Sequence, residues 1–281
     1  MLAALGDLVE DVIVRLDGPV NIASDTHAAI SRRRGGSAAN VTARAVELGH
    51  PARLLGQVGS DAIGTALIAE LHDDGVDASM VRRGGSTGTI VALVDQLGER
   101  SMLTDRRACL DLADPDPSWL DEVDTLHVPF YSLATGPIAA TTSTVIGWAH
   151  ERSVAVSVDV SSTAIMYEVG LDEVVRRLVE AAPTVVLANA DEAAALSIDG
   201  PFVGALAVVK RGPRSALVHL LDGSTVEVDA ISIPGVNDTT GAGDAFAAGF
   251  LTSPNWTDDP VAACQAGHEA AAGLLRTRAG R

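Results

Sequence analysis

The stretch Asp238-Thr239-Thr240-Gly241-Ala242-Gly243-Asp244-Ala245-Phe246 carries the strongest signal in this chain. It follows a short apolar segment, 230–236, and runs into the small-residue pattern Ala247–Leu251, so two glycines lie where a loop becomes a helix. Glycine brings bare backbone N–H groups close to a ligand. The first N–H groups of a helix lack internal partners and favour an anion such as phosphate. With Asp244 at the same point, the stretch combines the anion cradle and the proton acceptor that phosphoryl transfer to a hydroxyl group requires.

The same stretch also fits an ordinary capped helix start, because Asp and Thr are favoured at helix N-termini and Gly occurs in turns without a ligand. It matches neither the phosphate-loop pattern GxxxxGK[ST], which occurs nowhere in the chain, nor the dinucleotide pattern GxGxxG, because Phe246 fills the last position. The local pattern favours neither interpretation over the other.

A second glycine signal, Gly35-Gly36-Ser37-Ala38-Ala39-Asn40, shifts the balance. We expect Ser37 to cap a helix that runs to Leu48 and ends at Gly49. Asn40 would then lie in the first turn, where its amide can both donate to and accept from a ligand hydroxyl group. A glycine turn followed by a polar first turn, without a ligand, remains the alternative for this segment alone.

Together the two segments resemble the ribokinase or PfkB family of carbohydrate kinases. Residues 35–59 fit the N-terminal signature of that family, and 238–251 fit its C-terminal signature. The first signature is in register at Asn40, Thr42, Gly49 and Gly59. The family's NxxE element is matched between them, by Asn189-Ala190-Asp191-Glu192, and the similarity extends from Gly6 to about Gly280.

The resemblance implies a ribokinase-like α/β fold, a three-layer sandwich with a mainly parallel central sheet and a small antiparallel β lid. We expect one kinase domain over residues 1–281, with lid strands drawn from about 8–34 and 87–107. In this family the lid covers the sugar and often forms a dimer contact, so a homodimer through the lid is expected.

Apolar runs of strand length alternate with longer helical patterns, which favours a mainly parallel sheet covered on both faces. The predicted strands are 53–58, 125–128, 154–159, 184–188 and 205–210, and the predicted helices are 61–74, 137–151 and 171–182. Two further strand patterns, 8–16 and a hairpin over 89–104 that turns at 96–99, lie outside this alternation. They predict a small separate sheet, with a decorative edge hairpin as the alternative.

Composition bounds the class and the location of the protein. Apolar residues make up 47% of the 281, yet no uninterrupted apolar run approaches the ~20 residues needed to cross a bilayer. Acidic residues directly follow Met1 to Gly6, so we expect no secretory signal and a cytoplasmic location. Cys109 and Cys264 are too few for a disulfide framework or a zinc site.

The net charge of −17 makes nucleic acids and anionic membranes poor partners. The basic run Arg32-Arg33-Arg34 fits a solvated loop face, or alternatively attraction of an anionic substrate toward the cleft. The expected partner is therefore a small molecule, a sugar or a nucleoside.

The motifs assign the catalytic groups. We expect Asp244 to accept the proton of the acceptor hydroxyl group, and Gly241, Ala242 and Gly243 to donate N–H groups to the transferred phosphoryl group. Because the transition state is loose, an Asp of ordinary pKa is a sufficient base.

The nucleotide side is expected at the carboxyl ends of the strands. The resemblance implies that Asn189 and Glu192 lie near the triphosphate of ATP and its Mg²⁺, with Glu192 acting through metal-bound water. Helix capping by this pair is the alternative. Lys210 and Gly212 match the region beside the adenine and ribose of ATP, and His268 matches a position that commonly contacts the base.

The resemblance also implies a monovalent cation at Asp238 and Thr240. In the family that site uses a further segment near the C-terminus, where this chain reads Arg276-Thr277-Arg278-Ala279-Gly280-Arg281. Because this segment departs from the family pattern, potassium activation is left open.

On the acceptor side, Asp11, Gly36 and Asn40 match residues that hold sugar hydroxyl groups. Ribokinases proper have an acidic residue after the central strand, where this chain has Phe130 and Tyr131. That departure weakens ribose as the substrate and leaves a ketose, a keto-sugar acid or a nucleoside. Neither Arg106 nor Asp159 has a clear role at this stage.

An ATP-dependent kinase of a sugar or sugar-like hydroxyl group is the leading hypothesis. A nucleoside kinase is the first alternative, because Phe130 and Tyr131 could stack on a base. A sugar-phosphate kinase is kept open by Arg32–Arg34 and Arg106. A non-catalytic sensor of sugar or nucleotide is the alternative from another class, but Asp244 and both loop glycines are present and count against it.

Overall fold

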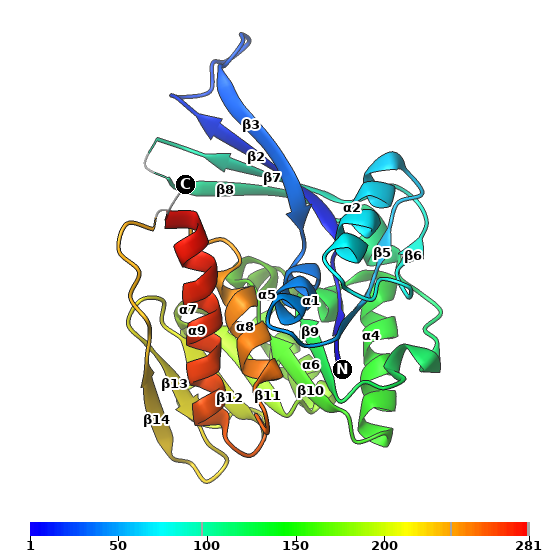
Figure 1. Cartoon of the computed structure of the whole chain (residues 1–281), viewed down its shortest axis with the longest axis vertical. Helices are drawn as coiled ribbons and strands as arrows, with labels where there is room; N and C mark the ends of the chain where they lie inside the picture. The colour runs from blue at the N-terminus through cyan, green and yellow to red at the C-terminus, as the bar shows by residue number, and fades with distance from the viewer. Residues whose placement is uncertain (97, 237, 280–281) are drawn as a thin grey trace.

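The main sheet has eight strands in the order β14-β13-β12-β11-β10-β9-β1-β4 (Figure 1). The computed structural model describes residues 1–96, 98–236 and 238–279. The strands are β1 (Leu2–Leu5), β4 (Ala52–Leu55), β9 (Thr125–Pro129), β10 (Ala155–Asp159), β11 (Val185–Asn189), β12 (Leu206–Lys210), β13 (Ser215–His219) and β14 (Thr225–Asp229). The strands from β4 to β12 are parallel, and β13 and β14 extend the sheet as an antiparallel edge. The predicted mainly parallel sheet is confirmed.

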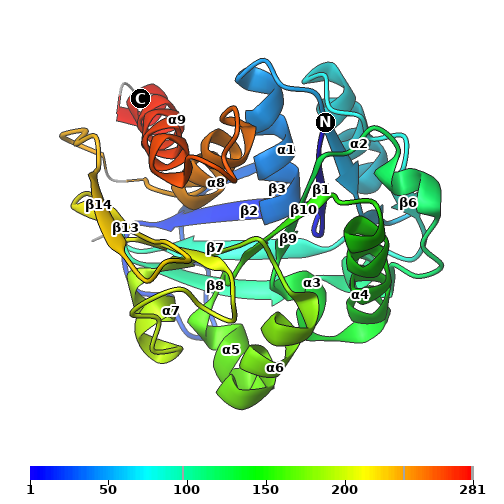
Figure 2. The same ribbon diagram turned by 90° about the horizontal axis from the view of Figure 1, so that it is seen from below.

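Helices cover both faces of this sheet, which gives the predicted three layers (Figure 2). One face carries α1 (Ser37–Glu47), α2 (Ala62–Asp73), α8 (Ala242–Thr252) and α9 (Pro260–Ala279). The other carries α3 (Tyr131–Ala134), α4 (Gly136–Glu151), α5 (Thr163–Val169), α6 (Leu171–Ala181) and α7 (Ala190–Ala195). Strands buried on both faces read as continuous apolar runs, which is why the sequence pattern located them.

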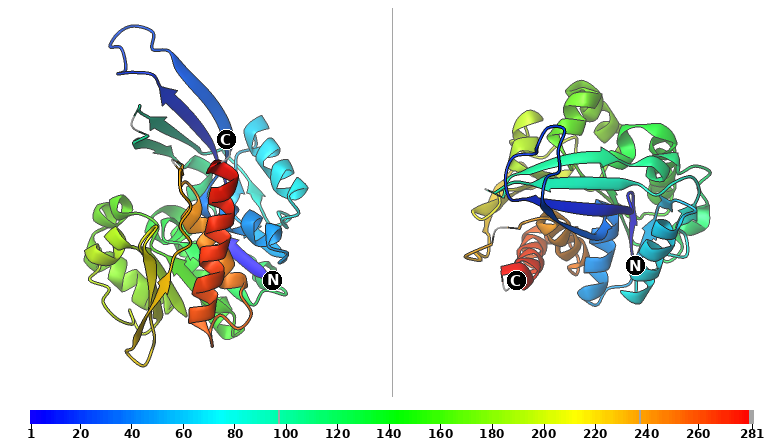
Figure 3. Two further views of the ribbon diagram at one scale, coloured as in Figure 1. Left: turned by 60° about the vertical axis from the view of Figure 1, so that its left-hand side comes forward. Right: turned by 90° about the horizontal axis from the view of Figure 1, so that it is seen from above.

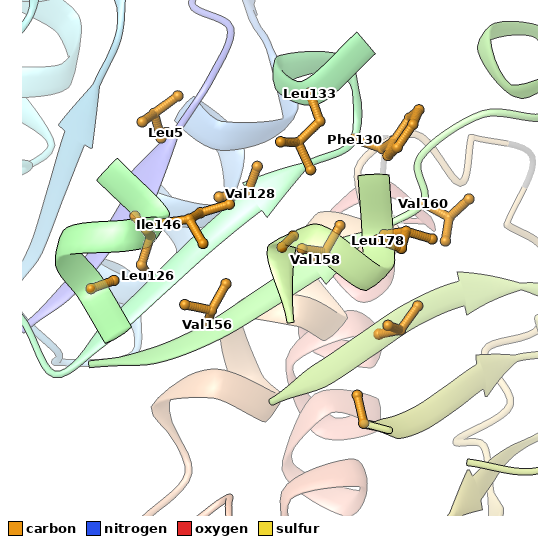
Figure 4. Close-up of a cluster of buried hydrophobic side chains, with 14 of the residues drawn as sticks. Leu5, Leu126, Val128, Phe130, Leu133, Ile146, Val156, Val158, Val160 and Leu178 are labelled. Atoms are coloured by element: carbon orange, nitrogen blue, oxygen red, sulfur yellow. The ribbon is translucent and has the colours of Figure 1, made fainter. Parts of the chain in front are cut away.

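Close packing of strand and helix side chains forms the core (Figure 4). Val128, Val156 and Val158 are fully buried on β9 and β10, and Ile146 of α4 and Leu178 of α6 lie against them. Burying a side chain of this size contributes roughly 1.5–3 kcal/mol. The core thereby fixes the carboxyl ends of the strands, where the polar residues described below are placed.

A second, four-stranded sheet stands over these carboxyl ends and is called the lid (Figures 1 and 3). It contains β2 (Val9–Leu16), β3 (Ala28–Gly35), β7 (Thr89–Val94) and β8 (Arg100–Asp105), in the order β3-β2-β7-β8. Each hairpin is antiparallel, as predicted, whereas the central pair β2–β7 is parallel because its strands come from separate segments. The predicted turn at 96–99 joins β7 to β8, and Leu97 of this turn lies outside the described residues.

Two corrections concern local structure. The predicted strand 53–58 is divided at Gly56 into β4 and the short β5 (Gln57–Val58), which pairs with β6 (Arg82–Arg83). Ser37 does not cap its helix, because Gly36 occupies the N-cap and Ser37 is the first helical residue. The short 3₁₀ helices η1 (Arg107–Asp111) and η2 (Pro117–Leu120) complete the described elements.

In the part of the chain that the structure describes, no helix combines the length and the apolar character needed to cross a membrane.

Candidate active site

The N-termini of α1 and α8 meet at Asp244. Gly241 caps α8 in the left-handed conformation, with φ 74°, and Asp244 lies in the first turn that follows. The Ser37 hydroxyl donates to Asp244 Oδ1 at 2.6 Å, and the Asn40 amide donates to Oδ2 at 2.8 Å. The two glycine-containing segments, separated by about 200 residues in the sequence, therefore form one site around this carboxylate.

Gly36 allows α1 to approach this site. Its φ is 102°, and a Cβ atom on it would lie 2.2 Å from the carbonyl oxygen of Asp7. No other residue fits this backbone position without moving the turn after β1. The close approach places the first turn of α1 beside Asp244 and explains why Ser37 contacts a carboxylate rather than a helix N–H group.

The environment of Asp244 makes it a better base than an exposed carboxylate. Burial raises its pKa, whereas the hydrogen bonds from Ser37 and Asn40 lower it, and the net shift is upward. A raised pKa increases the proton affinity of the carboxylate, which is what a general base needs.

Lys210, the only lysine of the chain, lies beside Asp159 at the carboxyl ends of β12 and β10. Its ammonium nitrogen is 2.5 Å from Asp159 Oδ2, and both side chains are largely buried. Burial lowers the pKa of Lys210, but the neighbouring carboxylates, above all Asp159, outweigh burial and raise it. A permanently charged ammonium group therefore lies close to Gly243, since a Cβ atom on that glycine would be 3.7 Å from Nζ.

Asn189 and Glu192 form the capping box of α7. The Asn189 side chain accepts from the N–H groups of Asp191 and Glu192, and the Glu192 carboxylate accepts from the backbone and amide nitrogens of Asn189, both at 2.7 Å. Burial raises the pKa of Glu192 to about 7, with Asp159 adding to the rise and Lys210 opposing it. Capping is thus observed, and the predicted contact with ATP and Mg²⁺ stays a prediction.

Two of the three predicted acceptor residues, Asp11 and Asn40, line one cavity, and Gly36 does not line it. A small cavity of about 150 Å³ is lined in part by Asp11, Asn40, Gly241 and Asp244. Asp11 lies on β2 opposite Arg33 of β3, and the guanidinium group of Arg33 is 3.7 Å from the Asp11 carboxylate. The cavity therefore connects the lid to the glycine loop.

Arg106 and the two aromatic residues have separate roles in the structure. Arg106 donates to the buried Asp7 at 2.8 Å and stacks 3.7 Å from the ring centre of Tyr131. Phe130 is fully buried in the hydrophobic core. The suggestion that Phe130 stacks on a nucleoside base is therefore wrong, because packing covers its ring.

Three further predicted residues are placed as follows. The N–H group of Ala242 donates to the carbonyl oxygen of Thr239 at 3.1 Å. Gly212 lies two residues after Lys210, the last residue of β12. His268 is buried, 3.2 Å from the Val228 carbonyl oxygen and edge-on to Phe246. Their contacts with ATP stay predictions.

The oxygen atoms expected to hold a monovalent cation are already bonded. Asp238 Oδ1 accepts from Arg100 at 2.6 Å and from Arg278 at 3.1 Å, and the Thr240 carbonyl oxygen accepts from Arg278. Burial raises the pKa of Asp238, but hydrogen bonds from Thr240 and Arg100 and the charge of Arg278 hold it well below its ordinary value. These residues do not fit a bound monovalent cation.

No sequence motif contains Arg100, and the motifs give Asp159 no role. The position of Asp159 at a strand end was a usable signal. Arg100 reaches Asp238 across 138 residues, a contact that no local pattern indicates.

Comparison with known proteins identifies the family. Residues 1–280 match the model of the pfkB family of carbohydrate kinases. The chain belongs to the PfkB family. An ATP-dependent ribose-1-phosphate kinase of Halopiger xanaduensis is 34% identical over 266 residues, which cover 89% of this chain and 82% of that protein. The expected class, a carbohydrate kinase that binds ATP, is confirmed.

Two solved PfkB-like structures share the fold. An uncharacterised sugar kinase of Pyrococcus horikoshii in complex with ATP has a TM-score of 0.83 at 24% identity, covering 98% of this chain and 92% of that one. A protein of E. coli assigned as ribokinase II, in complex with ATP and Mg²⁺, has a TM-score of 0.81 at 19% identity with the same coverage. These likenesses confirm the predicted ribokinase-like architecture with its lid.

Proposed function

We propose that this PfkB kinase transfers the γ-phosphoryl group of ATP, in line, to a hydroxyl group of a sugar or sugar-like molecule. The observation that carries the proposal is the position of Asp244: it lies in the first turn of α8, beside the glycine cap, and lines the cavity that also contains Asp11 and Asn40. The test is ADP release from ATP across a panel of sugars, sugar acids, sugar phosphates and nucleosides. If none of these acceptors led to ADP release, the proposal would be contradicted.

Asp244 acts as the base. The acceptor hydroxyl group takes the place of the Ser37 hydroxyl and the Asn40 amide at the carboxylate, and it gives its proton to Asp244 as the new phosphorus–oxygen bond forms. Asp11 and Asn40 hold other hydroxyl groups of the acceptor, since a carboxylate accepts and an amide bonds in both directions. Water is displaced from this partly enclosed cavity, which strengthens the electrostatic contacts.

The Gly241–Gly243 loop binds the charge that develops on the transferred group. Because Gly241 caps α8, the N–H groups of the first turn point toward the cavity end of the helix and carry its positive partial charge. Gly243 leaves space for an anion beside Lys210. In the proposed transfer, the Ala242 N–H group exchanges its bond with Thr239 for one to the phosphoryl group.

Lys210, Asn189 and Glu192 hold the triphosphate end of ATP. Lys210 lies between the carboxylate Asp159 and Gly243, so its ammonium group can bind a phosphate oxygen without leaving Asp159. Glu192 would reach Mg²⁺ bound to ATP through a metal-bound water, because both of its carboxylate oxygens accept hydrogen bonds from Asn189 and Mg²⁺ keeps most of its waters. When bound, Mg²⁺ supplies charge neutralisation of the phosphate oxygens.

We expect Lys210→Met to raise the KM for ATP at least about 10-fold, because a hydrogen bond to a charged group contributes roughly 1.5–3 kcal/mol. The substitution also leaves Asp159 buried without its cation and lowers the melting temperature. The double variant Lys210→Met/Asp159→Asn should recover stability but not ATP affinity. Arg211→Met, one residue along the chain, serves as the control, and an unchanged KM in Lys210→Met would remove Lys210 from the site.

The pH profile should report the environment of Asp244. Because its pKa is raised, kcat/KM should fall on acidification at a pH above the ordinary Asp value of 3.8, as the base becomes protonated. The Ser37 hydrogen bond lowers this pKa. Ser37→Ala should therefore shift the fall of kcat/KM at acidic pH, the acid limb of the profile, to higher pH. Ser143→Ala, at an exposed serine of α4, is the matched control and should leave the limb unchanged. An acid limb that does not respond to Ser37→Ala would contradict the assignment.

A phosphorylated sugar is the second candidate acceptor. The relative with 34% identity is a ribose-1-phosphate kinase, and Arg33 lines the cavity beside Asp11. A guanidinium group binds phosphate through paired hydrogen bonds. Comparing kcat/KM for ribose, ribose 1-phosphate and adenosine decides among the classes: a preference for ribose 1-phosphate that Arg33→Ala abolishes supports this candidate, and a preference for ribose or adenosine excludes it.

The lid supports a homodimer. The strand registers place Val12, Val14, Ile30, Val91 and Leu103 on the lid face opposite to Asp11. Ile30 and Leu103 are more than half exposed on this face, which also carries the Arg32–Glu10 ion pair, and such a mixed surface fits a second copy of the chain. Light scattering should give the mass of a dimer, and Leu103→Glu should give a monomer. We also propose that the protein is located in the cytoplasm.

A further inference from the structure

Three guanidinium groups from three separate elements surround Asp238, just before the glycine loop. Arg100 of β8 is 2.6 Å from Asp238 Oδ1, and Arg278 of α9 is 3.1 Å from the same oxygen. Arg33 of β3 is 4.0 Å from Oδ2. The Asp238 carboxylate thus faces three guanidinium groups, one of which, Arg33, also lies 3.7 Å from Asp11.

Arg100 and Arg278 each bond two groups of this segment at once. Arg278 donates to the Asp238 carboxylate and to the carbonyl oxygen of Thr240, and Arg100 donates to the same carboxylate and to the Thr240 hydroxyl group. The Thr240 N–H group also donates to Asp238 Oδ1, at 2.9 Å. Carboxylate, carbonyl and hydroxyl oxygens are the ligands that a hard metal cation would take. In this chain, planar guanidinium groups take them.

The bonded segment controls the position of the glycine loop. Thr240 directly precedes Gly241, whose left-handed conformation begins α8, and the Thr239 carbonyl oxygen accepts from Ala242. A cation held against the Thr240 carbonyl oxygen therefore fixes the residue before the helix N-terminus. Guanidinium is charged at every physiological pH and is part of the chain, so it cannot dissociate.

We propose that Arg278 and Arg100 are the built-in cation of this kinase: they hold the segment 238–240 in the position that shapes the anion site, and the enzyme needs no monovalent metal cation. This inference rests on the proposed function, because it assigns the arginines as positioning residues for phosphoryl transfer. Neither side chain touches the reacting atoms in this role.

The test compares wild type, Arg278→Ala and Arg276→Ala with KCl varied at constant ionic strength, using tetramethylammonium chloride as the balance. We expect wild-type kcat to change less than about 2-fold and kcat of Arg278→Ala to fall about 10-fold or more, as for a lost charged hydrogen bond. Low concentrations of guanidinium chloride should restore part of this loss. Arg276, exposed two residues earlier in α9, is the matched control and should behave as wild type.

Melting temperature provides a readout that does not depend on activity. Ligand binding raises apparent stability by mass action, so KCl or low guanidinium chloride should raise the melting temperature of Arg278→Ala and leave that of the wild type unchanged. Wild-type activity or melting temperature that rises with potassium, or an Arg278→Ala variant with full activity in its absence, would overturn the inference. If no condition gave ADP release, the proposed function would be contradicted instead. The melting temperatures would still show whether potassium or guanidinium binds at Asp238 and Thr240.

Discussion

Asp244→Asn should lower kcat by about 100-fold or more and leave the affinity for ATP within a few-fold of the wild type. The amide has nearly the same shape as the carboxylate but cannot accept the proton of the acceptor hydroxyl group. Asn40 donates to Asp244 Oδ2 in the free enzyme, so an amide at position 244 can keep that contact through its own oxygen atom. The loss should therefore fall on turnover rather than on folding.

Steady-state kinetics with calorimetric titration of an ATP analogue separates these effects. Asp258→Asn, at an exposed carboxylate just before α9, is the matched control for the change of charge and should be indistinguishable from wild type. An Asp244→Asn variant that is folded and fully active would remove Asp244 from the role of base.

Gly243→Ala should also reduce kcat by about 100-fold, because it places a methyl group where the transferred phosphoryl group is expected and weakens contacts that typically contribute about 3 kcal/mol to the barrier. The folded state should tolerate the change. The new Cβ would lie 3.7 Å from Lys210 Nζ, an ordinary van der Waals distance, and Ala favours a helix over Gly by roughly 1 kcal/mol.

Gly249→Ala, in the same helix, should give the opposite result. A Cβ at that position would lie 2.5 Å from the Ala266 carbonyl oxygen and 2.6 Å from the Ala270 side chain, so α8 and α9 must separate. Overpacking of this kind typically costs about 1–3 kcal/mol. Thermal unfolding and kcat measured on both variants test the pair. If Gly243→Ala lowered the melting temperature but left kcat unchanged, Gly243 would be needed only for the turn and not for binding the phosphoryl group.

The sheet and its covering helices were predictable because buried parallel strands and the helices between them differ in length and in apolar period. The runs at β9 to β12 were located to within about two residues, since each is a mostly apolar segment of strand length. The sequence did not predict the central strand β1, because Leu2–Leu5 is a short apolar segment with no helical pattern before it. The edge strands β13 and β14 were missed as well.

The motif residues were predictable because their chemistry depends on local backbone geometry. Gly241 and Asp244 are placed by the start of α8, and Asn40 by the first turn of α1. Ser37 was assigned the wrong partner, since a Ser after two glycines usually caps its own helix, whereas here Asp244 of a distant helix accepts its hydroxyl group.

Contacts between distant segments could not be predicted. Arg100 and Arg278 meet at Asp238 through the positions of the lid and of α9, which depend on the packing of the whole domain. The burial of Phe130 has the same origin, because the sequence does not indicate which side of β9 its ring packs on.

A crystal structure with a non-hydrolysable ATP analogue, Mg²⁺ and an acceptor that supports ADP release tests the central claim most directly. We predict the γ-phosphate about 3 Å from the N–H groups at Gly243, and the acceptor hydroxyl group in place of Ser37 at the Asp244 carboxylate. A γ-phosphate bound away from the Gly241–Gly243 loop, with Asp244 still bonded to Ser37 and Asn40, would contradict it.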